Sequence, residues 1–128
     1  MTKESTLVQS IKKDYKMLKS KYSIVGNLIG KHTNTERKGV YIVATRHYPK
    51  TKYVMKLVPC PKIDDVFHAP NEMVTVCALQ KLFIFKDNQS IAKIEDIYKI
   101  KYKDGSISMA LIFEKGHEDF QQLIAKWI

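Results

Sequence analysis

The sequence predicts an α+β domain, an antiparallel and strongly bent sheet or small barrel of about six or seven strands with an N-terminal amphipathic helix and a C-terminal closing helix. Several short segments alternate apolar and polar residues between turn residues, which indicates strands. Residues 6–22 and 117–128 instead repeat apolar residues at helical spacing. A length of 128 residues favours one domain over residues 1–128, with the sheet over about residues 40–114.

Residues 97–114 carry the clearest strand signal. Asp104-Gly105 interrupts two alternating runs, and this dipeptide favours a two-residue type I′ hairpin turn. Such a turn places six apolar side chains on one face: Tyr98, Ile100, Tyr102, Ile107, Met109 and Leu111. In this register Tyr102 pairs with Ile107. A slip of one residue would carry the intervening lysines into the core, so the sequence predicts a well-specified register.

The predicted N-terminal helix spans about residues 6–22. Thr6 and Gln9 fit a capping box, with Thr6 as the N-cap. One stripe is apolar: Leu7, Val8, Ile11, Tyr15, Leu18 and Tyr22. The other side carries Lys12, Lys13, Lys16 and Lys19. This lysine face is either a solvated surface or a contact with a polyanion or an anionic membrane.

Four more segments are predicted as strands: residues 40–48, 53–58, 73–79 and 82–86. The first two are apolar on both faces over part of their length, so we expect a cover on each face. Residues 23–39 read as a basic, glycine-punctuated loop, and residues 90–96 suit either a helical turn or a bulged strand. In the closing helix, at about residues 117–128, Trp127 is expected to fill the core.

The formal net charge is +9, with 22 lysines and arginines against 13 acidic residues. This excess favours an acidic partner such as nucleic acid, an anionic membrane or an acidic protein. Only Arg37 and Arg46 are arginines, and lysine lacks the fork that reads a base or phosphate bidentately, so polyanion binding is expected to be weakly specific. An AT-rich genome, as in low-GC bacteria and their phages, is a compositional alternative for part of the lysine content.

The candidate residues for binding an anionic partner lie in four basic segments. They are Lys12, Lys16, Lys19, Lys31, Arg37, Lys38, Arg46, His47, Lys50, Lys52, Lys99, Lys101 and Lys103. Around residues 46–52, Tyr48 and Tyr53 flank the cations. Bases could stack on tyrosines placed in this way, although an ordinary solvated turn has the same composition.

No catalytic residue, metal site or cofactor is predicted. The one carboxylate–histidine cluster is Asp64, Asp65, His68 and Glu72, which suits a metal or acid–base site, or more simply a turn at residues 64–65. Residues 26–33 fail as a phosphate-binding P-loop, because the spacing of their glycines is too short. Cys60 and Cys77 form no redox or zinc motif. We therefore expect a protein that is not an enzyme.

A cytoplasmic location is expected. No apolar run approaches the roughly 18 residues that indicate a transmembrane helix. Residues 1–10 lack the apolar core of a signal peptide, and the two cysteines suit a reducing compartment.

The order of elements near the C-terminus resembles a known family. The residues that carry it are Leu82-Phe83-Ile84-Phe85, Ile94-Glu95-Asp96-Ile97, Phe113, Phe120, Leu123 and Trp127. This pattern resembles the second half of pleckstrin-homology-like and GRAM-like domains. The resemblance implies a small bent antiparallel sheet closed by a C-terminal helix, acting as a non-catalytic scaffold for proteins or anionic headgroups. The N-terminal helix is additional to that pattern.

Two functional hypotheses follow. The first is a binding or adaptor module of pleckstrin-homology-like type that recognises a protein or another anionic partner. The alternative is a basic, weakly sequence-specific nucleic-acid-binding protein, such as a bacterial or phage regulator, although no known nucleic-acid-binding signature is present. A peripheral contact with an anionic membrane is the weaker third choice.

Overall fold

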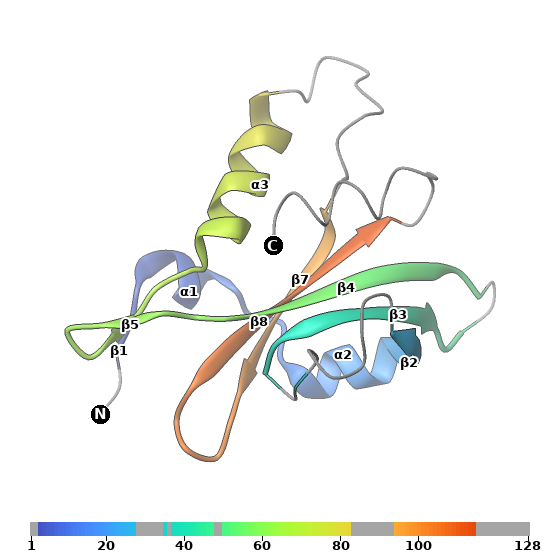
Figure 1. Cartoon of the computed structure of the whole chain (residues 1–128), viewed down its shortest axis with the longest axis horizontal. Coiled ribbons are helices and arrows are strands. Elements are labelled where there is room, and N and C mark those ends of the chain that lie inside the picture. The colour runs from blue at the N-terminus through green and yellow to red at the C-terminus, as the bar shows by residue number, and fades with distance from the viewer. Residues whose placement is uncertain (1–2, 28–34, 36, 48–49, 83–93, 115–128) are drawn as a thin grey trace.

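The computed structural model describes residues 3–27, 35, 37–47, 50–82 and 94–114. Within these residues the chain has an α+β fold, as predicted, and its main element is a five-stranded antiparallel sheet (Figure 1). The strands, in their order across the sheet, are β2 (Tyr22–Asn27), β3 (Gly39–Thr45), β4 (Lys52–Pro59), β8 (Ile107–Glu114) and β7 (Ile94–Lys101). Among the described strands the sheet does not close into a barrel.

A second, smaller sheet lies beside the N-terminal end of the chain (Figure 1). It contains three two-residue strands, β1 (Lys3–Glu4), β6 (Val66–Phe67) and β5 (Lys62–Ile63). The described helices are α1 (Thr6–Ser10), α2 (Tyr15–Lys21) and α3 (Asn71–Leu82). None of the helices in the described part of the chain is long and apolar enough to cross a lipid bilayer.

The main sheet is buried on both faces. On one face α1 and α3 supply Val8 and Met73, and we call this cluster the α1/α3 core. On the other face α2 supplies Leu18, and we call this cluster the α2 core. Alternate residues of β8 enter different cores, because successive side chains of a strand point to opposite faces. Leu111 thus lies in the α1/α3 core and Ile112 in the α2 core, and both are fully buried.

The predicted β-hairpin at residues 97–114 is present, but its predicted register is wrong by one residue. Tyr98 lies opposite Ala110, and Lys101 lies opposite Ile107. The turn contains three residues rather than two. The Gly105 N–H donates to the Tyr102 carbonyl over 3.0 Å, and the Tyr102 N–H donates to the Ser106 carbonyl over 2.9 Å. This pattern is that of a type I turn followed by a bulge.

Gly105 is required by this turn. Its φ of 89° lies in the region that disfavours an L side chain. We expect Gly105→Ala to lower the free energy of unfolding by about 1–2 kcal/mol, as measured by urea denaturation. A matched Lys103→Ala change, at an exposed residue of the same turn, would leave φ at residue 105 unaltered. An unchanged midpoint for Gly105→Ala would contradict the three-residue turn.

The predicted helix at residues 6–22 is two helices and the start of a strand. The predicted N-cap is wrong, since Ser5 is the N-cap of α1 and accepts the Val8 N–H. Asp14 caps α2 by accepting the Met17 N–H over 2.9 Å. Between the helices, the Lys13 carbonyl accepts the Lys99 N–H over 2.7 Å. The chain therefore leaves the helical path to pair with the edge of β7.

The strand predicted at residues 73–79 is also wrong, because these residues belong to α3. The Val74 N–H donates to the Pro70 carbonyl at the first turn, and Glu72 in that turn forms a 2.5 Å ion pair with Lys56 of β4. Met73 is buried in the α1/α3 core. Of the strand predicted at 82–86, Leu82 ends α3 and the rest lies outside the described residues. The closing helix at 117–128 with Trp127 also lies outside them.

Candidate functional site

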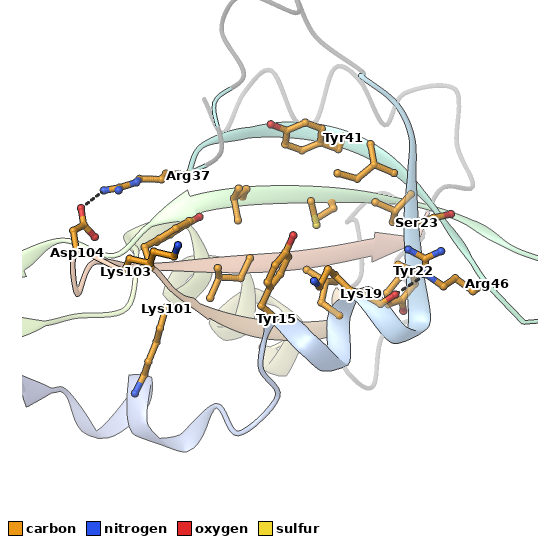
Figure 2. A pocket seen from close by; sticks show the side chains of 17 residues that line it. Tyr15, Lys19, Tyr22, Ser23, Arg37, Tyr41, Arg46, Lys101, Lys103 and Asp104 are labelled. Carbon is orange, nitrogen blue, oxygen red and sulfur yellow. Dashed lines mark hydrogen bonds and ion pairs between the residues drawn. The ribbon is translucent and has the colours of Figure 1, made fainter.

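A pocket of about 820 Å³ lies on the face of the main sheet that α2 covers in part (Figure 2). Its floor is the apolar face of three strands, formed by Val43, Met55, Leu57 and Ile100. One wall is α2, which contributes Tyr15, Leu18 and Lys19, and the start of β2 continues it. The volume lies within the roughly 300–1,000 Å³ of sites for small molecules.

Tyrosines give the pocket hydroxyl groups that stay protonated. Burial, together with the nearby charge of Asp96, raises the pKa of Tyr22 to about 12. Tyr22 packs edge-to-face on Tyr53 with ring centroids 5.7 Å apart. Burial also raises the pKa of Tyr41, whose hydroxyl donates to the Thr35 carbonyl over 2.7 Å. The tyrosine rings therefore contribute apolar surface to the pocket, and their hydroxyl groups stay neutral.

Two cations occupy the end of the pocket near α2. The Arg46 Nε donates to the Lys19 carbonyl over 2.5 Å, so the guanidinium is held at the C-terminal end of α2. The Lys19 Nζ lies 4.7 Å from the centroid of the Tyr15 ring. Among the described residues, no carboxylate pairs with either side chain. We call Lys19 and Arg46 the cation pair.

The opposite end, at the β7–β8 turn, is largely neutralised. Arg37 forms a 2.7 Å ion pair with Asp104, donates to the Ser106 hydroxyl over 2.9 Å and lies over the Tyr102 ring. Hydrogen bonds from Ser106, and then from Arg37, hold the pKa of Asp104 well below its usual range. Figure 2 shows Arg37 directed at Asp104, away from the cation pair.

The neighbouring lysines of this turn differ from each other. Lys101 contributes to the lining, but its Nζ lies 3.0 Å from the Glu4 carboxylate. In Figure 2 the Lys101 side chain extends away from the pocket toward the N-terminal part of the chain. Lys103 also lines the pocket, and it pairs with no carboxylate in the described part of the chain. Of the described lysines that line this end, Lys103 is thus the one whose ammonium has no carboxylate partner.

The structure brings together five of the thirteen candidate binding residues, from separate basic segments: Lys19, Arg37, Arg46, Lys101 and Lys103. Six others lie elsewhere on the surface: Lys12, Lys16, Lys38, His47, Lys50 and Lys52. Lys31 lies outside the described residues.

Lys99 neither lines the pocket nor lies exposed on the surface. Its side chain is only 14% exposed and forms a 2.5 Å ion pair with Glu4. The Lys99 Nζ also donates to the Val8 carbonyl over 3.3 Å. The paired ammonium therefore fastens β1 and α1 to β7 instead of facing a partner.

The apolar and tyrosine lining was missed by sequence reasoning. Tyr15 and Tyr22 appeared only as part of a helical apolar stripe, and Tyr41 only as one alternating strand residue. The available signal was that residues 40–48 and 53–58 are apolar on both faces. This pattern indicated a covered second face, but it did not indicate that α2 would cover only part of it.

The carboxylate–histidine cluster does not assemble into a metal site. Asp64 and Asp65 form the two-residue β5–β6 turn with φ of 51° and 63°, as a type I′ turn requires. Glu72 pairs with Lys56. In the described ranges no three His, Cys, Asp or Glu side chains could hold a metal ion. Burial raises the pKa of the Cys60 thiol to about 12, which disfavours the reactive thiolate.

Comparison with known proteins gives no assignment. No protein-family model matches the chain, and no curated protein matches its sequence significantly.

Proposed function

We propose that the protein is a non-catalytic binding module for an anionic partner, and that the partner binds in the pocket beside α2. The observation that supports this most directly is the cation pair at the edge of an apolar floor. Lys19 and Arg46 lack a carboxylate partner within the described residues, whereas Arg37 and Lys101 at the other end each have one.

The composition of the pocket favours affinity for an anion with an apolar body. Apolar surface gains free energy when a ligand removes it from water, at about 25 cal/mol per Å². Hydrogen bonds between ionised groups are stronger than neutral ones and fix orientation. Neutral tyrosine hydroxyls and ammonium or guanidinium groups suit binding of this kind. Binding is therefore proposed in preference to catalysis.

The pleckstrin-homology-like assignment stays part of this proposal. The antiparallel sheet and the β7–β8 hairpin support it. Leu82, the first residue of the resemblance, ends α3 instead of beginning a strand, and residues 83–85 lie outside the described residues. Residues 117–128, which would supply the closing helix, lie outside the described residues.

Nucleic acid is the second candidate partner. Lys50 and Lys52 at the β3–β4 connection and Lys12 and Lys16 near α2 are all exposed. No carboxylate pairs with these four lysines in the described part of the chain, so they could contact phosphates without first breaking an ion pair. Phosphate contacts of this type are salt-dependent and weakly specific.

The proposal predicts that an anionic aromatic probe binds through the cation pair. We expect 1-anilinonaphthalene-8-sulfonate to bind the folded protein with a stoichiometry of one. The double variant Lys19→Glu/Arg46→Glu should weaken this binding at least about tenfold, because a charge-assisted contact contributes about 1.5–3 kcal/mol. The measurement is fluorescence titration at constant salt, with melting temperatures recorded for each variant.

The control is Lys12→Glu/Lys16→Glu, which changes the net charge by the same amount away from the pocket. Equal weakening by both double variants would mean that the probe responds only to net charge, and the pocket would be rejected as the binding site. Unlabelled oligonucleotides serve as competitors in the same titration. If they bind tightly but leave the probe in place, nucleic acid binds elsewhere on the surface.

A further inference from the structure

The lining of the pocket specifies more about its ligand than negative charge. We infer that the pocket takes an amphiphilic anion, a molecule with one anionic head and a single aliphatic chain, such as an alkyl carboxylate. This inference rests on the proposed function and names the ligand class for the same pocket.

The floor selects an aliphatic body over a nucleobase. Val43, Met55, Leu57 and Ile100 carry no side-chain hydrogen-bond donor, and the thioether of Met55 is at most a weak acceptor. The backbone groups of these strands already pair in the sheet ladders. A base pressed on this floor would leave some of its edge groups without partners, and each unpaired buried group is unfavourable. A methylene chain has no such groups.

The charges select a single head at one end. The cation pair combines a point charge, Lys19, with a guanidinium, Arg46, that is fixed by its hydrogen bond to the Lys19 carbonyl. At the other end Asp104 pairs with Arg37, and the Lys101 ammonium lies on Glu4, a carboxylate that it shares with Lys99, with its side chain extending away from the pocket (Figure 2). A ligand with two anionic ends would meet there, among the described residues, one lysine without a carboxylate partner, Lys103. The asymmetry therefore matches a molecule with one charged end.

The register of the strands gives the direction of the chain. Tyr22 lies opposite Thr45, next to Arg46 and hence at the end that holds the cation pair. Along β4, Met55 pairs with Ile112, and Leu57 pairs with Ala110, closer to the β7–β8 turn. An alkyl chain whose head contacts the cation pair thus runs over Met55 and then Leu57 toward Tyr102.

The experiment is a titration with dodecanoate, followed by the methyl signals of protein labelled with ¹³C-methyl methionine. The chain contains five methionines. Met55 lies in the pocket floor, whereas Met109 is fully buried in the α1/α3 core on the opposite face. We expect saturable shifts of the Met55 signal, with the Met109 signal unchanged, at ligand concentrations below those at which micelles form.

Chain length and head charge are then varied. From octanoate to dodecanoate, affinity should rise about three- to fourfold per methylene, the value for burying a methylene group. Dodecanol and dodecyltrimethylammonium should bind at least about tenfold more weakly than dodecanoate, because they lack the charge-assisted contact. Lys19→Ala/Arg46→Ala should remove this preference for the carboxylate, whereas Lys12→Ala/Lys16→Ala, which changes two exposed lysines outside the pocket lining, should change dodecanoate affinity less than about twofold.

Each outcome bears on the inference. Equal binding of dodecanol and dodecanoate would overturn the anionic head, and no gain with chain length would overturn the aliphatic body. If the sulfonate probe depends on the cation pair but dodecanoate leaves Met55 unshifted, the inference fails and the proposed function stands. If no anion depends on the cation pair, both fail. Shifts of Met55 produced by an oligonucleotide and not by dodecanoate would assign the pocket to nucleic acid.

Discussion

Ile112→Ala should lower the free energy of unfolding by about 2–5 kcal/mol, the range for truncating a buried isoleucine. Ile112 is fully buried in β8 and belongs to the α2 core, which also contains Leu18 of α2 and Tyr98 of β7. Removing three carbons there leaves a cavity that the paired strands on both sides cannot close. Urea denaturation followed by circular dichroism measures the change.

Two further variants test whether the sheet has a buried core on each of its faces. Leu111→Ala, one residue earlier, removes a fully buried side chain from the α1/α3 core and should have a similar effect. Ile24→Ala changes a residue that is 61% exposed, and it should change stability by less than about 0.5 kcal/mol. If Leu111→Ala destabilises strongly and Ile112→Ala does not, the hairpin has one buried face and the described α2 core is wrong.

The β7–β8 hairpin shows which structural features local sequence patterns predict and which they do not. Alternation and Asp104-Gly105 correctly predicted two strands and the position of the turn. Both a two-residue and a three-residue turn accept an Asp-Gly pair, however, so the dipeptide did not fix the register. Lysines were predicted to stay out of the core, but the Lys99 side chain is only 14% exposed because its ammonium pairs with Glu4, which is distant in sequence. Such long-range neutralisation leaves no local signal.

The errors near the helices have a related cause. The apolar stripe at residues 6–22 continued across the break, so periodicity did not show that Asp14 caps a new helix. At residues 73–79 the β-branched residues favoured a strand. Tertiary contacts override that propensity, because Met73 packs in the α1/α3 core and Glu72 pairs with Lys56.

The site could be predicted from the sequence only in part, because it too depends on contacts between residues that are distant in sequence. Composition directed attention to cations, and five of the candidate residues line the pocket. A cation that already pairs with Asp104 or Glu4 is less able to bind a ligand. These ion pairs depend on the fold, because they join residues that are distant in sequence. The apolar floor depends on the relative placement of α2 and the sheet, which no single segment encodes.

Asp96 should be the main source of acid sensitivity, because it is buried, whereas Asp104, whose pKa is also lowered, is exposed and its ion pair is screened by solvent. Its side chain is 6% exposed, accepts hydrogen bonds from the Lys13 Nζ over 2.5 Å and the Tyr98 hydroxyl over 2.6 Å, and lies 3.6 Å from the Lys21 Nζ. Burial alone would raise the pKa of Asp96. The hydrogen bonds from Lys13 and Tyr98 and the charge of Lys21 outweigh burial and lower it. The carboxylate thereby joins the α1–α2 segment to β7.

The sign of the pH dependence follows from this lowered pKa. A group with a lower pKa in the folded state stabilises the fold above its unfolded pKa, about 3.9 for Asp, and this contribution is lost as pH falls through the folded pKa. Asp96→Asn should therefore lower the free energy of unfolding by about 2–3 kcal/mol at pH 7, since charge-assisted hydrogen bonds are lost. As pH falls below about 4, the difference between the variant and the parent protein should shrink, and it should disappear once pH lies below the folded pKa.

Glu4 provides the necessary control, because Lys99 and Lys101 also lower the pKa of its carboxyl against the opposing effect of burial. Glu4→Gln should remove its own part of the acid dependence and leave the part from Asp96. Urea denaturation from pH 3 to pH 7 on the parent protein, both single variants and the double variant separates the two contributions. Because Asp96 holds the α1–α2 segment and Glu4 holds β1 to β7, their effects should be nearly additive. An Asp96→Asn protein with the same slope of stability against pH as the parent would show that a different carboxylate controls acid unfolding.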